Sequence, residues 1–202
     1  MAMAGQPEST DQINLFHEAL DFGLEILSIA ELQLKEKQYD VVKCVVLDNK
    51  DVLAVLPTGY GKSLIYQLLP PVFNFMACGG KPEEKKSTVI VISPLNSLIR
   101  DQIVKMREGG LSVCVLRGDR VATEDDNDGI SIDVPTEMLC RGHFDLIFTH
   151  PEVLVENKKV SKLLIMPAFK EKVKAIVVDE AHLVVDWYVA TYLSRSFCCN
   201  RD

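Results

Sequence analysis

The sequence has no excess of positive charge. Its 202 residues include 29 Asp or Glu against 22 Lys or Arg, which gives a formal net charge of −7. Without an overall basic field, any contact with nucleic acid must come from a local patch and depend only modestly on salt. The chain also lacks an apolar run near the roughly 20 residues of a membrane-spanning helix, and its first ten residues lack the features of a signal peptide. These absences predict an intracellular protein.

Cysteine pairs of the C-x-x-C type are missing too, although the chain has six cysteines. Structural zinc sites and dithiol redox sites are typically built from such pairs. The sequence therefore does not support a zinc site. Three cysteines (Cys44, Cys114 and Cys140) lie within or beside apolar stretches, which favours buried thiols in a reducing compartment.

The composition allows one well-packed domain, with 48% hydrophobic and 25% charged residues. We expect residues 1–10 to be disordered, residues 11–187 to form a single domain and residues 188–202 to be a divergent tail. Apolar residues recur at helical spacing over residues 11–27 and again over 32–47. This spacing predicts two N-terminal helices.

Short apolar runs then alternate with helical patterns. The runs are nearly continuous rather than alternating polar and apolar, which favours strands buried on both faces, as in a parallel sheet. They cover residues 52–56, 88–93, 112–116, 144–148 and 175–178, and the helical patterns cover 63–76, 95–108 and 152–165. The order predicts an α/β fold: a mainly parallel sheet flanked by helices and preceded by the N-terminal helices.

The strongest local signal is Leu-Pro-Thr-Gly-Tyr-Gly-Lys-Ser over residues 56–63, between a predicted strand and a predicted helix. Glycines such as Gly59 and Gly61 let the backbone curl so that N–H groups and the positive end of the next helix face a phosphate. Lys62 would then reach the β- and γ-phosphates, and the Ser63 hydroxyl would bind Mg²⁺. The strict pattern has glycine where this chain has Leu56, so an ordinary loop remains the alternative.

A second signal is the acidic pair Asp179-Glu180, directly after the apolar run 175–178. Ligands of open α/β sheets bind outside the carboxyl ends of the strands. Asp179 would hold Mg²⁺ and Glu180 would orient or deprotonate an attacking water. The alternative is a plain strand cap or turn. The phosphate loop upstream favours the catalytic interpretation.

Together these motifs resemble the helicases of superfamily two, and most closely the RecQ family of DNA helicases, over residues 34–187. Residues 34–38 lie where that family has an aromatic-Arg-x-x-Gln motif, so Gln38 corresponds to a glutamine that reads adenine, with Leu34 and Lys35 replacing the aromatic residue and the arginine. Residues 93–102 resemble motif Ia, Pro151-Glu152 the end of motif Ib, and Asp-Glu-Ala-His over 179–182 motif II.

The resemblance implies a first RecA-like lobe that binds ATP and Mg²⁺ and contacts DNA, in a protein of the nucleus. The implied ATP ligands are Gln38, Thr58, Gly59, Gly61, Lys62, Ser63 and His182, with Ser63 and Asp179 as metal ligands and Lys62, Asp179 and Glu180 as catalytic residues. The implied contacts to single-stranded or junction-containing DNA are Ser93, Pro94, Pro151, Glu152 and Trp187.

After Trp187 the sequence stops following the family pattern, and we expect this chain to lack the family's second lobe with its arginine finger. In P-loop enzymes such an arginine contributes on the order of 10³–10⁵ in rate. Two hypotheses remain from the residues. Either the chain is the ATP-binding lobe of a 3′–5′ DNA helicase, or it is an inactive truncated form that binds ATP or DNA and competes with a longer enzyme. A P-loop ATPase of another kind fits less well, because residues 93–102 and 179–182 both match the helicase motifs.

Overall fold

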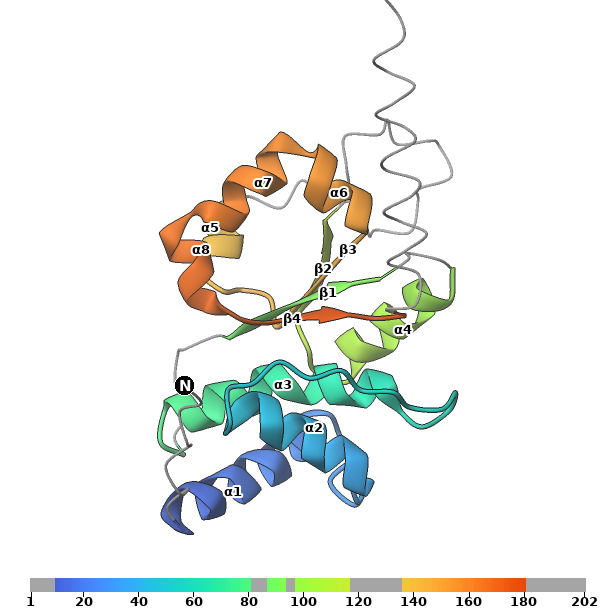
Figure 1. Cartoon of the computed structure of the whole chain (residues 1–202), viewed down its shortest axis with the longest axis vertical. Coiled ribbons are helices and arrows are strands. Elements are labelled where there is room, and N and C mark those ends of the chain that lie inside the picture. Colours follow the sequence, from blue (N-terminus) through green and yellow to red (C-terminus); the bar gives the residue numbers. More distant parts are fainter. Residues whose placement is uncertain (1–9, 81–86, 94–96, 117–135, 181–202) are drawn as a thin grey trace, which may run out of the picture.

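The computed structural model describes residues 10–80, 87–93, 97–116 and 136–180. They form a layered α/β structure with helices on both sides of one sheet (Figure 1). The helices are α1 (Thr10–Ile26), α2 (Glu36–Val46), α3 (Lys62–Ala77), α4 (Ser97–Glu108), α5 (Thr136–Cys140), α6 (Pro151–Glu156), α7 (Lys158–Ile165) and α8 (Pro167–Lys172). The strands are β1 (Thr88–Ile92), β2 (Val113–Leu116), β3 (Leu146–Thr149) and β4 (Val173–Val178).

The four strands pair in the order β2-β3-β1-β4, and every pair is parallel. Val91 of β1 lies between Phe148 of β3 and Val177 of β4. Because all strands run in one direction, their carboxyl ends share one edge of the sheet. The predicted α/β fold with a parallel sheet is confirmed.

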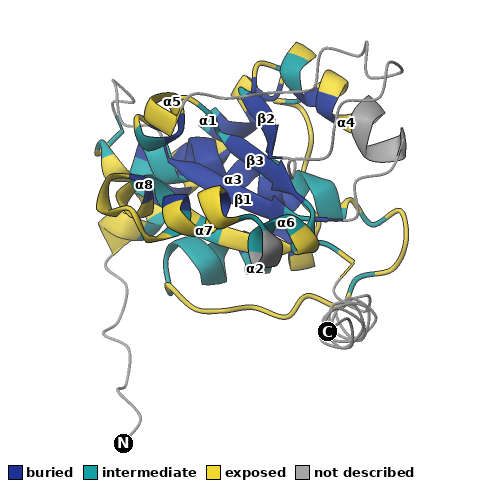
Figure 2. Ribbon diagram, turned by 90° about the horizontal axis from the view of Figure 1, so that it is seen from above, coloured by how far each residue is buried: buried dark blue, intermediate teal, exposed yellow. Residues whose placement is uncertain are grey.

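Side chains on the two faces of the sheet enter two separate apolar cores. One face contributes residues such as Val89 and Phe148 to the core that α1, α2, α3 and α4 complete. The opposite face contributes Ile90 and Ile147 to a smaller core under α5, α7 and α8. Burial on both faces explains why these strands read as continuous apolar runs. The sheet accordingly appears as a buried layer between half-exposed helices (Figure 2).

The two predicted N-terminal helices are present as α1 and α2, and both pack against α3. Helix α1 crosses α3 closely at Gly23, where an added Cβ would lie 3.1 Å from Leu68 and 3.3 Å from Val72. Glycine at this position lets the two backbones approach. This packing fixes α3, and with it the loop that precedes α3.

Two predicted elements are wrong. Residues 52–56 form no strand, and Leu53 and Val55 are 82% and 81% exposed. The segment runs beside α3 and faces β4 across a pocket, so it forms no ladder with the sheet. The helical pattern over 152–165 is two helices, because the Asn157 side chain accepts hydrogen bonds from the backbone N–H groups of Lys159 and Val160 and starts α7 anew.

The outer edge of β4 has no strand beside it among the described residues. Its residues alternate between half-buried and exposed, and Ile176 is 60% exposed. Strand β4 therefore has one paired edge, toward β1, and one open edge, toward residues 52–56.

The described cysteines are all free thiols, of which Cys114 is buried and Cys44, Cys78 and Cys140 are half-buried. Burial raises the pKa of Cys114 to about 12, and nearby Arg107 offsets part of that rise. The buried-thiol prediction is thus confirmed for Cys114 and wrong for Cys44 and Cys140, while Cys198 and Cys199 lie outside the described residues. In the described part of the chain, no helix has the length and apolar character to cross a bilayer.

Candidate functional site

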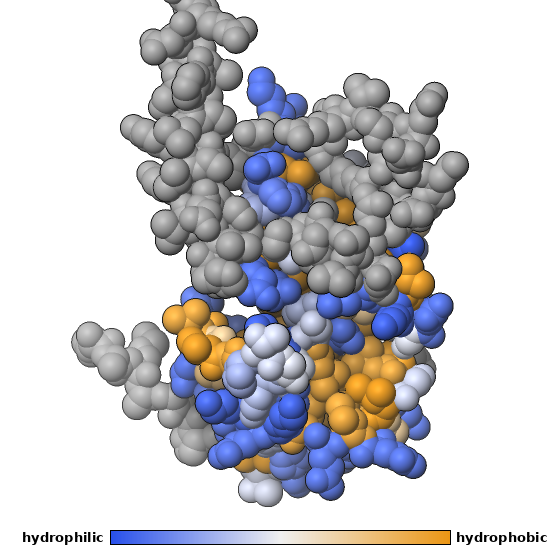
Figure 3. Space-filling view, turned by 90° about the vertical axis from the view of Figure 1, so that its right-hand side faces the viewer, coloured by the Kyte–Doolittle hydropathy of each residue, from blue (hydrophilic) through white to orange (hydrophobic). Residues whose placement is uncertain are grey.

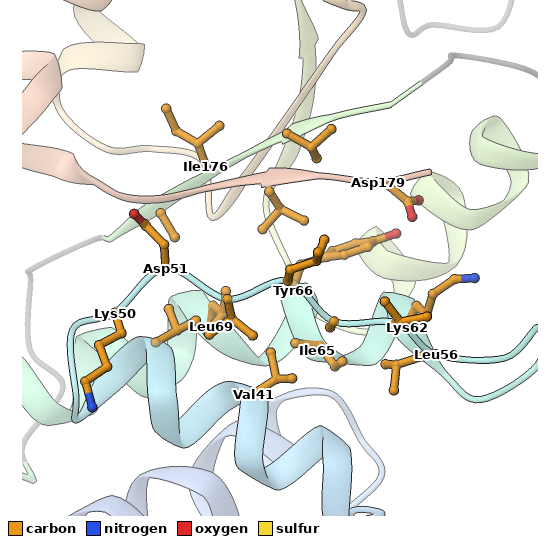
Figure 4. A pocket seen from close by; sticks show the side chains of 18 of the residues that line it. Val41, Lys50, Asp51, Leu56, Lys62, Ile65, Tyr66, Leu69, Ile176 and Asp179 are labelled. Atoms are coloured by element: carbon orange, nitrogen blue, oxygen red, sulfur yellow. The ribbon is translucent and has the colours of Figure 1, made fainter. Parts of the chain in front are cut away.

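A pocket of about 730 Å³ lies between α3 and the open edge of β4. Residues 49–56 form its outer wall, and Val41 and Val45 of α2 reach its floor. Lys62 and Asp179 lie at one end of it (Figure 4), and Glu180, next to Asp179 in the chain, also lines it. The sheet therefore brings the two strongest sequence signals, which are more than a hundred residues apart in the chain, to one place.

The loop before α3 has the conformation that a phosphate loop requires. Gly59 and Gly61 have φ angles of 76° and 93°, in the left-handed region that glycine adopts at little cost. Helix α3 begins at Lys62 with Gly61 as its N-cap, and no side chain caps it. The first N–H groups of a helix have no partner within the helix, so this end of α3 is suited to bind an anion. The predicted loop-to-helix turn is confirmed, although no strand precedes it.

Two side chains from the start of α2 hold this loop from outside. The Gln38 amide donates hydrogen bonds to the carbonyls of Tyr60 (3.1 Å) and Gly61 (3.0 Å). The Lys35 ammonium donates to the Tyr60 carbonyl (3.1 Å) and lies 4.6 Å from the centre of the Tyr60 ring. Gln38 is only 3% exposed. A Cβ at residue 61 would come within 2.5 Å of the Gln38 amide nitrogen, so the contact also depends on glycine there.

These contacts determine where the loop N–H groups point. The peptide bonds of this loop, like all those between described residues, are trans, and in a trans peptide the C=O and N–H point in opposite directions. With the carbonyls of Tyr60 and Gly61 turned toward α2, the N–H groups of Gly61 and Lys62 point away from it. Gln38 and Lys35 thus orient the donors that a phosphate would meet.

The acidic pair extends from the end of β4. The Asp179 backbone N–H donates to the Ile92 carbonyl of β1 (2.9 Å), and the Glu180 N–H donates to an Asp179 carboxylate oxygen (3.0 Å). Burial raises the pKa of Asp179 above its usual value, and the Glu180 charge adds to the rise, while the Glu180 N–H and the Lys62 ammonium oppose it. Glu180 has a φ of 53°, a left-handed conformation that costs a non-glycine residue about 1–2 kcal/mol.

Tyr66 is a site residue that the sequence motifs do not indicate. It lies one helical turn after Ser63 on α3, is 3% exposed, and packs edge-to-face on Phe148 with ring centroids 6.0 Å apart. Its hydroxyl points toward Asp179 (Figure 4). Burial raises the pKa of Tyr66 to about 12, a hydrogen bond with the Ser63 side chain lowers it, and the Asp179 charge raises it further. The helical i, i+3 spacing was the one signal that could have indicated this residue.

The side chains around Tyr66 fit a magnesium ion. The Ser63 hydroxyl and the Asp179 carboxylate both interact with the Tyr66 hydroxyl, so they converge on one region. Both are hard oxygen ligands of the kind Mg²⁺ prefers, and Mg²⁺ usually takes only one or two protein ligands together with phosphate and water. A bound cation would also relieve the unfavourable burial of the Asp179 charge.

Other predicted site residues lie along the same edge of the sheet. The Ser93 N–H, at the end of β1, donates to the Thr149 carbonyl at the end of β3 (3.1 Å). Ser93 is 1% exposed, and its hydroxyl has no hydrogen-bond partner among the described residues. Pro151 and Glu152 start α6 beyond β3, and a Glu152 carboxylate oxygen lies 3.5 Å from His150 Nδ1.

Three predicted residues, Pro94, His182 and Trp187, lie outside the described residues, as does the tail 188–202. The described candidates share the side of the molecule at which β4 ends. Seen from that side, apolar surface lies directly beside hydrophilic surface (Figure 3).

Comparison of the sequence with known proteins identifies the family to which the chain belongs. Residues 35–197 match the model of the DEAD/DEAH box helicases. ATP-dependent DNA helicase hus2/rqh1 of Schizosaccharomyces pombe is 35% identical over 141 residues, which cover 70% of this chain and 10% of that protein. ATP-dependent helicase wrn-1 of Caenorhabditis elegans is 29% identical over 82% of this chain and 14% of its own length. RecQ-like DNA helicase BLM of Xenopus laevis is 26% identical over 90% of this chain and 11% of its own length. The chain thus spans between a tenth and a seventh of these relatives.

Proposed function

Because the chain belongs to the DEAD/DEAH box helicase family and is RecQ-like within it, we propose that its α/β domain is a first RecA-like lobe that binds ATP with Mg²⁺. In a complete helicase this lobe would couple ATP hydrolysis to 3′–5′ unwinding of DNA. The observation that carries the proposal is the shared pocket, in which Lys62 at the start of α3 meets Asp179 and Glu180 at the end of β4.

The phosphate loop would hold the triphosphate. Gly59 and Gly61 allow the loop to curl, Thr58 lies at its exposed side, and the N–H groups of Gly61 and Lys62 point away from α2. The Lys62 ammonium would neutralise charge on the terminal phosphates. His182 would contribute from beyond the described residues.

The acidic pair would supply the hydrolytic step. Ser63 and Asp179 would bind Mg²⁺, which neutralises charge on the phosphates when bound. Glu180 is exposed at the mouth of the pocket, where it would accept a proton from the attacking water.

The carboxyl edge of the sheet would meet the DNA. Ser93 and Pro151, at the ends of β1 and β3, lie on the same edge as Asp179, and Pro94, Glu152 and Trp187 would extend the track. The buried, unpartnered Ser93 hydroxyl supports a contact there, because an unpaired buried polar group costs about 1–3 kcal/mol until a ligand satisfies it. A DNA substrate implies the nucleus in a eukaryotic cell.

The test is ATP turnover of the purified protein with and without single-stranded DNA. We expect DNA-stimulated turnover that Lys62→Ala abolishes. Lys50→Ala is the matched control, because Lys50 lines the other end of the same pocket and pairs with Asp48 (3.2 Å). Equal loss in both variants, or no loss in Lys62→Ala, would contradict the assignment.

A second candidate is a non-catalytic module that binds ATP or DNA and competes with a longer helicase. Nucleotide binding that depends on Lys62, without turnover in the presence of DNA, is the result expected of this module.

A further inference from the structure

We propose that the outer side of α7 and α8 is a second DNA-binding surface, which holds the phosphate backbone without reading the bases. The inference rests on the proposed function, in which the carboxyl edge of the sheet meets DNA, and it adds a contact away from that edge. It is carried by the uneven distribution of charge over the two sides of the sheet.

Charge is segregated between the two layers of helices. Helix α1 has four acidic residues and no lysine or arginine, and all four are exposed: Asp11, Glu18, Asp21 and Glu25. Helix α7 has three lysines and no acidic residue, and α8 has two lysines and one glutamate. Helix α1 and the pair α7 and α8 lie on opposite sides of the sheet (Figure 1). A polyanion is therefore repelled by one side of the molecule and attracted by the other.

The lysines of α7 point outward because the opposite side of this helix is buried. Val160 and Leu163 enter the smaller core. Lys158 and Lys162 are about one turn apart on the other face of the helix, and both are exposed. Lys170 is exposed on α8, which packs against α7. We define Lys158, Lys162 and Lys170 as the lysine surface.

The lysine surface continues the DNA track proposed along the sheet edge. That track includes Pro151 at the start of α6, and Asn157 alone separates α6 from α7. The six residues of α6 span about 9 Å, and the phosphates of one DNA strand are spaced about 3.4 Å apart along the helix axis. A strand that leaves the track over α6 therefore reaches Lys158 after about four phosphates.

Lysine side chains in this position would bind DNA through its phosphates. An exposed ammonium on a flexible stem acts as a point charge toward a phosphate, and such contacts carry no sequence information. Each phosphate that a lysine neutralises releases counterions, which steepens the salt dependence of binding to single-stranded DNA by about 0.7. The salt dependence thus counts phosphate contacts, and a merely structural role of these lysines would not change it.

The experiment measures the affinity of the whole chain for a fluorescent single-stranded oligonucleotide over a series of KCl concentrations. We expect the double variant Lys158→Gln/Lys162→Gln to reduce the slope of log association constant against log salt by about 1.4. Binding should weaken about three- to tenfold, by the same factor for oligonucleotides of different sequence. Lys37→Gln/Lys105→Gln is the matched control, because it removes the same charge from exposed lysines of α2 and α4, on the other side of the sheet.

Three results would overturn the inference. They are an unchanged slope in Lys158→Gln/Lys162→Gln, an equal reduction in the control, which would reflect net charge alone, and weaker binding to vesicles of anionic phospholipid with unchanged DNA affinity, which would assign the surface to a membrane. Nucleotide binding without DNA tests the proposed function separately. It should depend on Lys62 and be equal in both double variants, and binding unaffected by Lys62→Ala would overturn the nucleotide site instead.

Discussion

The Tyr66 phenol forms a hydrogen bond with the side chain of Ser63, one turn earlier on α3, and its ring rests on the sheet at Phe148. The charge of Asp179, from the end of β4, acts on the same hydroxyl. Tyr66 thereby connects the helix that follows the phosphate loop with the strand that presents the acidic pair. It is a positioning residue for the two side chains expected to bind magnesium.

Tyr66→Phe should weaken the magnesium dependence of nucleotide binding and leave the fold intact. The phenylalanine ring keeps the contact with Phe148, and only the hydroxyl partner of Ser63 is lost, which is a change of about 1 kcal/mol. The Mg²⁺ concentration for half-maximal binding should rise about three- to tenfold. Tyr39→Phe is the control, because it removes a hydroxyl that pairs with His17 (2.9 Å) on the outer helices. Identical magnesium titrations for wild type and Tyr66→Phe would contradict this role.

The same residue should make the protein sensitive to alkali. The pKa of Tyr66 is about 12 in the folded protein, against an ordinary value of 10.0. Above pH 10 the unfolded chain loses this proton first, so the free energy of unfolding falls as the pH rises from 10 to 12, by roughly 3 kcal/mol in total. Urea unfolding at pH 8 and pH 11 would measure the fall. In Tyr66→Phe this contribution should be absent, and an equal fall in the variant would assign the effect to other groups.

Asp179→Asn should stabilise the ligand-free protein while abolishing turnover. The fold raises the pKa of this carboxyl, mainly because burial disfavours its charge. The folded state therefore holds the proton more tightly than the unfolded chain, and stability falls as the pH rises above about 4, the ordinary value for aspartate. An uncharged amide removes that loss, so we expect the melting temperature at pH 7 to rise by about 1–3 °C and its pH dependence between 4 and 7 to weaken. A lower melting temperature than wild type would contradict the explanation.

Glu180→Gln should separate binding from hydrolysis. The amide has the same shape but cannot accept a proton from water, so turnover should fall on the order of 10²–10⁴-fold with an almost unchanged nucleotide dissociation constant. Glu171→Gln is the control, because Glu171 is an exposed residue of α8. If Glu180→Gln also loses nucleotide binding, Glu180 is needed to form the binding site, and the assignment to hydrolysis alone is contradicted.

The open edge of β4 should cause self-association. An unpaired strand edge offers free backbone donors and acceptors to another chain, and Ile176 adds exposed apolar surface. Ile176→Lys should therefore lower the associated fraction in sedimentation at rising protein concentration. Ile165→Lys is the control, because Ile165 is a similarly exposed isoleucine at the end of α7. Equal effects of both variants would indicate nonspecific hydrophobic association rather than strand pairing.

The sequence was most informative where a single local rule decides the structure. Buried parallel strands need apolar residues on both faces, so β1, β2 and β3 could be predicted as apolar runs. Strand β4 has the same apolar composition, although its residues alternate between half-buried and exposed. The predictions for these four strands agree with the structure within two residues at each end. The turn at Gly61 and Lys62 follows from the left-handed glycine and the start of α3. These features depend on near neighbours in the chain.

Features that depend on contacts between residues far apart in the chain could not be predicted from the sequence. Residues 52–56 have strand-like composition, yet a strand exists only if another pairs with it, and the pocket separates them from β4. Lys35 and Tyr60 are 25 residues apart, and their contact follows from how α2 packs on α3. Tyr66 looks like an ordinary apolar helix position until β4 brings Asp179 beside it.

The order of strands also has a consequence for synthesis. Strands β1 and β2 come first in the chain but do not pair with each other. Both pair with β3, which lies between them in the sheet and is synthesised after them. Strand β4 then completes the sheet against β1 and brings in Asp179 and Glu180 last. Pairings between segments so far apart in sequence form slowly. On the ribosome, the phosphate loop is therefore complete long before the acidic pair arrives, and nucleotide affinity should appear only when the last strand has emerged.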